Sequence, residues 1–104
     1  MVARYWSARA RRDTAPQYAE HFNRHVLPVL QKVDGYVTAT LLQREVGHSI
    51  EIVVITYWRS LDAIRGFAGD DLEISVVAPE ATALFSDYDR RVRHYDVLVK
   101  DVPS

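Results

Sequence analysis

His94 is the residue of this sequence best suited to moving a proton. It lies in the stretch RRVRHYDVLV, residues 90–99, whose alternation predicts a strand with Val92, His94, Asp96 and Leu98 on one face. The carboxylate of Asp96 is expected roughly 7 Å away on the same face, where it raises the pKa of His94, whereas burial lowers that pKa. If the two effects nearly cancel, the ring exchanges protons around neutral pH. We therefore take His94 as the candidate general base. The alternative is a structural histidine, hydrogen-bonded at the sheet face.

Aromatic side chains supply a second candidate feature, a pocket for a flat apolar molecule. Such a pocket has mainly apolar and aromatic walls and only a few polar groups. The candidate wall residues are Trp6, His25, Trp58 and Phe67. Both tryptophans also suit a solid hydrophobic core, and this alternative stays open.

Two further histidines have a spacing that can hold a metal. His21 and His25 are four residues apart and so share one side of a helix, but no glutamate stands between them as a metalloprotease motif requires. We interpret His21 as solvated and His25 as lying at the edge of the apolar stripe. The chain has no cysteine, and its four glycines are scattered and form no phosphate-binding loop. We expect no metal and no cofactor.

The run IVVITYW, residues 52–58, belongs to the least polar stretch of the sequence and predicts a strand. Its β-branched residues suit a strand, and both of its faces are apolar, so neither face is built to meet water. The helices of a short chain cover one face of a sheet. We infer that a second copy covers the other face, which gives a symmetric homodimer packed sheet against sheet.

The remaining strands follow from alternation and turn residues. They are predicted over residues 2–9, 36–42 and 90–99, with a hairpin turn at residues 46–49 and a frayed tail at residues 100–104.

The helices follow from apolar spacing and from capping and stop residues. One is predicted over residues 15–34, with a Thr14/Gln17 capping box, a kink at Pro28 and an end at Gly35. Others are predicted over residues 61–68, from Asp70, and over residues 79–87. Ser60 is expected to cap the helix at 61–68, and Gly69 to end it. The order β-α-β-β-α-β predicts an α+β, ferredoxin-like fold with an antiparallel sheet and helices on one face.

Length and charge restrict the classes of function. A chain of 104 residues is expected to form one domain, residues 1–104. The net charge of -1 gives no general attraction to nucleic acid, and no apolar run is long enough to cross a membrane. The N-terminus lacks the apolar stretch of a signal peptide, so we expect a cytoplasmic protein.

Nearly the whole chain resembles small proteins of the antibiotic biosynthesis monooxygenase family. The segments that carry the resemblance are residues 3–6 (ARYW), 57–64 (YWRSLDAI), 67–70 (FAGD), 79–80 (PE) and 92–97 (VRHYDV). The resemblance implies a dimeric α+β barrel. The family includes cofactor-free oxygenases of polycyclic aromatic substrates, haem-degrading enzymes and isomerases.

The resemblance implies first a cofactor-independent monooxygenase of a small aromatic or quinol-like substrate. In that mechanism the substrate is deprotonated and its own carbanion reduces O2. His94 would be the base, and Trp6, His25 and Trp58 would be walls. The alternative is a non-catalytic homodimer, either structural or binding a small molecule.

Haem degradation is the third possibility, and three positions argue against it. The chain resembles the haem-degrading enzymes at Trp58 and Ser60. Phe67 then stands where those enzymes have a tryptophan, and Val77 where they have the histidine that binds iron. Their first-strand asparagine is replaced near Ser7.

Overall fold

The computed structural model describes residues 1–101, and the tail expected to fray lies largely outside this range. Its strands are β1 (Val2–Arg11), β2 (Tyr36–Val46), β3 (Ser49–Trp58), β4 (Phe85–Tyr88) and β5 (Arg93–Asp96). Its α-helices are α1 (Ala15–His21), α2 (Leu27–Leu30), α3 (Arg65–Ala68) and α4 (Pro79–Thr82). A π-helical turn, Phe22–Val26, joins α1 to α2, and a 3-10 turn, Asp62–Ile64, precedes α3.

The sheet is antiparallel, with the strand order β2-β3-β1-β4. The two last strands share one edge of β1: β5 pairs with its first half and β4 with its second half. This arrangement confirms the predicted ferredoxin-like α+β fold and the hairpin between β2 and β3. The last strand predicted over residues 90–99 is present but shorter, as β5. The helix predicted over residues 79–87 is wrong after Thr82, because β4 occupies the end of that segment.

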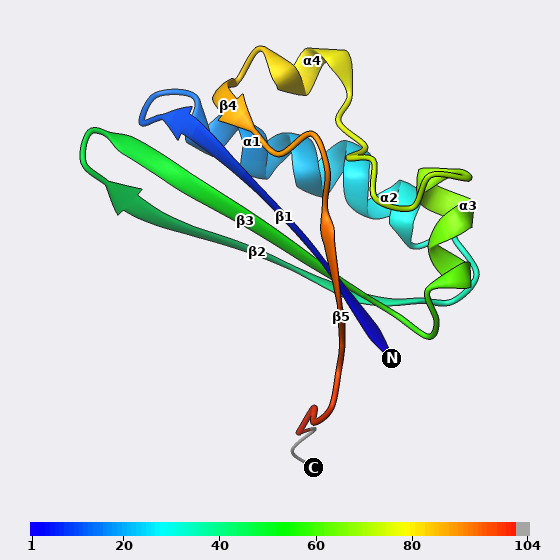
Figure 1. Ribbon diagram of the computed structural model, residues 1–104. Coiled ribbons are helices and arrows are strands. Elements are labelled where there is room, and N and C mark those ends of the chain that lie inside the picture. Colours follow the sequence, from blue (N-terminus) through cyan, green and yellow to red (C-terminus); the bar gives the residue numbers. More distant parts are fainter. Residues whose placement is uncertain (102–104) are drawn as a thin grey trace.

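The helices lie on one face of the sheet (Figure 1). In β3, the residues that face the helices are buried, with Trp58 and Ile52 only 0% and 2% exposed. Residues of the other parity, Val53, Ile55 and Tyr57, are half-buried. No helix lies on the second face of the sheet in Figure 1. One apolar face of this strand therefore packs inside the chain, and the other forms the open face of the sheet.

The helix predicted over residues 15–34 is divided where Pro28 interrupts its hydrogen bonds. Proline has no N–H, so the carbonyl of Arg24 loses its usual donor. The turn widens there, and the N–H of Leu27 bonds to the carbonyl of Phe22, five residues back. The predicted kink is thus a π-helical turn, and the regular helix ends at Leu30 rather than near Gly35.

Side chains that were expected to cap helices have two different roles. The Thr14/Gln17 capping box is wrong, because the hydroxyl of Thr14 donates instead to the carbonyl of Leu84 at 2.8 Å. The hydroxyl of Ser60 does accept a hydrogen bond from the N–H of Ala63 at 3.2 Å, as predicted.

Residues 69–78 form an extended segment that crosses from α3 to α4, and we call this segment the strap. Gly69 ends α3 with a φ of 81°, as expected of a helix-stopping glycine. The helix predicted from Asp70 is wrong, since backbone bonds tie the strap to the chain before β5 instead. The N–H of Val92 donates to the carbonyl of Glu73 at 2.7 Å, and that of Ser75 to the carbonyl of Arg90 at 2.9 Å.

Candidate functional site

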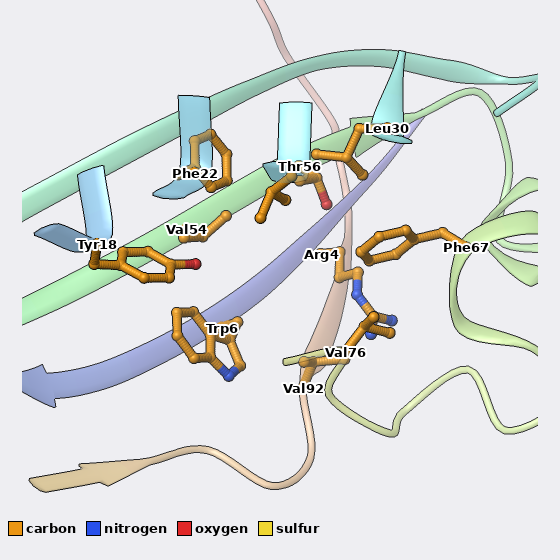
Figure 2. A pocket seen from close by; sticks show the side chains of 11 residues that line it. Arg4, Trp6, Tyr18, Phe22, Leu30, Val54, Thr56, Phe67, Val76 and Val92 are labelled. Carbon is orange, nitrogen blue, oxygen red and sulfur yellow. The ribbon is translucent and has the colours of Figure 1, made fainter. Parts of the chain in front are cut away.

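A small cavity of about 50 Å³ lies between the helices, the strap and the sheet. Residues 15–30, from the start of α1 to the end of α2, are called the first helical segment. Figure 2 shows the side chains of the cavity converging from β1, β3, the first helical segment, α3, the strap and the chain before β5. Most are apolar, and the polar ones are Arg4, Tyr18 and Thr56. The other lining residues are Trp6, Phe22, Val26, Leu30, Val54, Phe67, Val76 and Val92. The cavity has the composition of a site for an apolar molecule with one charged group.

Arg4 carries the charge of this cavity. Its side chain stands on the helix face of β1 and is only 5% exposed. Nη1 donates to the carbonyl of Leu72 at 2.5 Å, and Nη2 to the carbonyl of Ile74 at 2.6 Å, so Arg4 holds the strap against the sheet. Burial lowers the pKa of Arg4 to about 10, which leaves the group protonated at neutral pH.

His94 lies directly beside Arg4, with its Nε2 at 3.2 Å from Nη1. A guanidinium can only donate, so Nε2 is the acceptor and the proton of the neutral ring is on Nδ1. Burial, followed by the charge of Arg4, lowers the pKa of His94, and Glu73 opposes this effect. The expected influence of Asp96 is wrong, because the opposing carboxylate belongs to the strap rather than to the same strand.

Hydrogen bonds hold the two indole N–H groups and the Thr56 hydroxyl around the cavity. The indole N–H of Trp58 donates to the hydroxyl of Thr56 at 2.8 Å, and that of Trp6 to the carbonyl of Asp89 at 3.1 Å. Burial raises the pKa of Tyr18, so its phenol stays neutral and can donate a hydrogen bond. These bonds fix the aromatic walls in position.

A groove of about 280 Å³ lies outside the cavity, between the first helical segment and the strap. The two spaces share three lining residues, Val26, Phe67 and Val76. The other residues of the groove are His21, His25, Val29, Val77, Ala78 and Glu80. The shared side chains therefore separate the cavity from the groove, and Phe67 is the largest of them.

The structure distributes the predicted site residues over three places. Trp6 and Phe67 line the cavity. Trp58 is fully buried behind Phe67, with ring centroids 6.0 Å apart. His25 is exposed and lines the groove, where its ring lies 5.3 Å from that of His21.

His94, by contrast, is not among the described residues that line the cavity. It lines a shallow surface depression and reaches the cavity only through Arg4. Sequence reasoning missed Arg4 as a site residue. The available signal was an arginine on the same face of a strand as Trp6 and Ala8, a face that turned out to be buried.

Comparisons with known proteins identify the family. The sequence model of the antibiotic biosynthesis monooxygenase family matches residues 1–71. The chain belongs to this family. The match contains Arg4, Trp6, Trp58 and Phe67, whereas His94 and Val77 lie beyond it. A search of curated proteins found no match for this antibiotic biosynthesis monooxygenase family member.

Solved structures of low sequence identity share the family fold. An antibiotic biosynthesis monooxygenase from Bacillus cereus has 16% identity and a TM-score of 0.72, over 100% of this chain and 97% of that chain. The haem degrader MhuD from Mycobacterium tuberculosis has 16% identity and a TM-score of 0.68, over 98% of this chain and 100% of MhuD. The monooxygenase ActVA-Orf6 of Streptomyces coelicolor was solved in complex with nanaomycin D. It has 16% identity and a TM-score of 0.64, over 99% of this chain and 92% of ActVA-Orf6.

Proposed function

We propose that this protein is a monooxygenase that needs no cofactor and acts on a small aromatic or quinol-like substrate. The observation that carries the proposal is the buried Arg4 in an otherwise apolar and aromatic cavity, with a neutral histidine at 3.2 Å. Such a cavity can hold a flat molecule, keep water away and stabilise negative charge that develops on the substrate.

The proposed reaction uses the substrate as the reductant of O2. A carbon acid such as anthrone loses a proton from its CH2 carbon, and the resulting anion reduces O2 at that carbon. The hydroperoxide then loses water and leaves a carbonyl. One oxygen atom enters the product and the other leaves as water, so anthrone and O2 give anthraquinone and water. Arg4 stabilises the substrate anion in this scheme, and Nε2 of His94 accepts the proton once Arg4 turns to the substrate.

The size of the cavity requires a movement before a ring can bind. About 50 Å³ holds one or two water molecules, whereas an engineered protein cavity that binds benzene has about 150 Å³. We propose that the substrate approaches through the groove and displaces Phe67 and Val76, which separate the groove from the cavity. Val76 belongs to the strap, so the hydrogen bonds from Arg4 to the strap also affect the entry of substrate into the cavity.

The proposal includes a homodimer formed through the open face of the sheet. Val53, Ile55 and Tyr57 stand on this face and are half-buried in the single chain. Figure 1 shows no helix on this face of the sheet. A second copy would remove this apolar surface from water. The cytoplasmic location remains a prediction. Among residues 1–101, no helix is both long and apolar enough to span a bilayer.

A non-catalytic homodimer is the second candidate. The observation that favours it is the small volume of the cavity, which is close to that of a filled core. Haem degradation is the least favoured candidate. Val77, at the position of the iron-binding histidine in the resembling enzymes, lies in the wall of the groove and has no metal-binding atom.

Oxygen uptake tests the proposed function. The purified protein is mixed with anthrone under 18O2, in the presence of a metal chelator, and anthraquinone is examined by mass spectrometry. We expect uptake above the rate of spontaneous oxidation, equal amounts of O2 consumed and product formed, and one labelled oxygen in the product. A rate equal to that of heat-denatured protein with anthrone and related carbon acids would favour the non-catalytic homodimer.

A further inference from the structure

The positive charge of Arg4 has no carboxylate partner among the described residues. Its three hydrogen bonds end on two carbonyl oxygens and one ring nitrogen, all of them neutral acceptors. The arginines that do form ion pairs in the described chain are at least 51% exposed, while Arg4 is 5% exposed. A buried charge normally requires a partner of opposite charge, so the arrangement lacks an anion.

The hydrogen bonds of Arg4 also leave donors free. A guanidinium has five N–H groups, and the three bonds occupy both of those on Nη1 and one on Nη2. In the described chain, no side-chain nitrogen or oxygen that is fully buried lacks a hydrogen bond. The unbonded Nε of Arg4 must therefore border a space that water can reach, and Arg4 lines the cavity.

We infer that the ligand of this cavity carries an anionic oxygen, a carboxylate or a phenolate, which Arg4 binds through Nε–H and Nη2–H. The apolar body of the ligand packs against the aromatic side chains of the cavity. The centroid of the Phe67 ring lies 5.8 Å from the guanidinium carbon of Arg4. An anionic oxygen accepts shorter and stronger hydrogen bonds from arginine than a neutral one does. The inference rests on the proposed function only in placing the ligand in this cavity.

Nuclear magnetic resonance of the Arg4 Nε–H group tests the inference directly. The 15N-labelled protein is titrated with benzoate, with 4-nitrophenolate, and with neutral benzamide, whose shape is close to that of benzoate. The Arg4 signal is identified by its absence from the spectrum of Arg4→Lys. We expect benzoate or 4-nitrophenolate to move this signal downfield to saturation, and the anion that does so distinguishes a carboxylate site from a phenolate site. Benzamide should leave the signal in place.

Calorimetry with variants supplies a second measurement. Arg4→Met should weaken binding of the preferred anion at least tenfold. The matched control is Arg93→Met, because Arg93 is an exposed arginine that lies over Tyr5, with its guanidinium carbon 4.8 Å from the ring centroid. This control should bind the anion as the native protein does.

The inference is overturned if neither anion moves the Arg4 signal, or if benzamide moves it equally. It is also overturned if Arg4→Met binds the anion with native affinity. Should Arg4→Met fail to fold because the strap is released, the titration of the native protein still decides the question. Anion binding through Arg4 without oxygen uptake would leave the inference standing and refute the proposed function. Suppose instead that the protein takes up oxygen and binds both anions and benzamide alike, without a shift of the Arg4 signal. That result would support the proposed function and overturn the inference.

Discussion

Arg4 of β1 and His94 of β5 face each other in the sheet register and are joined by a hydrogen bond of 3.2 Å from Nη1 to Nε2. The same Nη1 donates to the carbonyl of Leu72, so one guanidinium links the last strand to the strap. Protonation of His94 would remove its acceptor nitrogen and place a second positive charge beside Arg4. The protonation state of His94 is therefore coupled to the closure of the cavity.

Stability should fall in mildly acidic solution because the pKa of His94 is lowered in the folded chain. The unfolded chain titrates near the ordinary value of 6.5, so below that pH the unfolded state binds more protons than the folded state. The stabilisation is complete above about pH 6.5 and is lost as the pH falls through the lower pKa of the folded state. Urea unfolding between neutral pH and pH 5 measures this loss.

His94→Gln keeps a hydrogen-bond acceptor for Arg4 but cannot titrate in this range, so its stability should vary less between neutral pH and pH 5. The lowered pKa values of Asp13 and Glu51 do not confuse the comparison, because carboxylates titrate at lower pH. If the free energy of unfolding changes with pH by the same amount in the native protein and in His94→Gln, the prediction is contradicted.

His94→Ala should preserve folding and reduce turnover of a carbon acid such as anthrone on the order of 100-fold or more. The reason is the loss of the nitrogen proposed to accept the substrate proton. The measurement is the initial rate of O2 uptake, with circular dichroism to check the fold. His48→Ala is the control, because His48 is exposed in the turn between β2 and β3 and lines neither the cavity nor the groove. An unfolded His94→Ala would show instead that His94 is a structural residue.

Ile55→Asp should convert the expected dimer into a monomer. Ile55 stands on the open face of β3, so the substitution buries an unpaired charge in the proposed interface and costs about 3–5 kcal/mol of dimer stability. Sedimentation at micromolar concentration should give about twice the chain mass of 11.9 kDa for the native protein and once for the variant. Leu61→Asp, at a position 44% exposed outside the sheet, should remain dimeric. A monomeric native protein would refute the interface.

Phe67→Ala should open the passage between the groove and the cavity. Removing this half-buried ring should cost about 1–3 kcal/mol of stability, less than the ~3–5 kcal/mol typical of a fully buried phenylalanine. Two-ring ligands such as 2-naphthoate should then bind faster than to the native protein, as followed by Trp6 fluorescence in stopped flow. Phe85→Ala is the control, because the Phe85 ring packs edge-on against Trp6 but does not line the cavity. Equal association rates for Phe67→Ala and the native protein would place the passage elsewhere.

Haem should not bind through an axial histidine at position 77, because valine has no iron-binding atom. A titration followed by absorption spectroscopy should give no stoichiometric, histidine-ligated Soret band. The variant His25→Ala serves as a control for weak binding by the exposed histidines of the groove. A stoichiometric band that disappears on substitution at or near Val77 would count against this prediction.

Local patterns in the sequence were sufficient for the order of elements from β1 to α3. Alternation and apolar runs identified β1, β2, β3 and β5 in part but not β4, and turn residues placed the hairpin correctly at Gly47, whose φ is 61°. These features depend on neighbours a few residues apart, and backbone sterics and side-chain periodicity determine them. For the same reason, the helix stop at Gly69 was predictable.

The tertiary structure decided which face of each strand is buried and what the site residues contact. Arg4 bonds to Leu72 and His94, which are 68 and 90 positions away, so no local pattern contains those contacts. The strand β4 in place of the end of a helix, the strap in place of a short helix, and the position of His94 outside the cavity all result from packing between distant segments. By itself the sequence determined an α+β, ferredoxin-like fold with an aromatic interior. The long-range contacts of Arg4 placed a charge in that interior, the one buried charged side chain among residues 1–101.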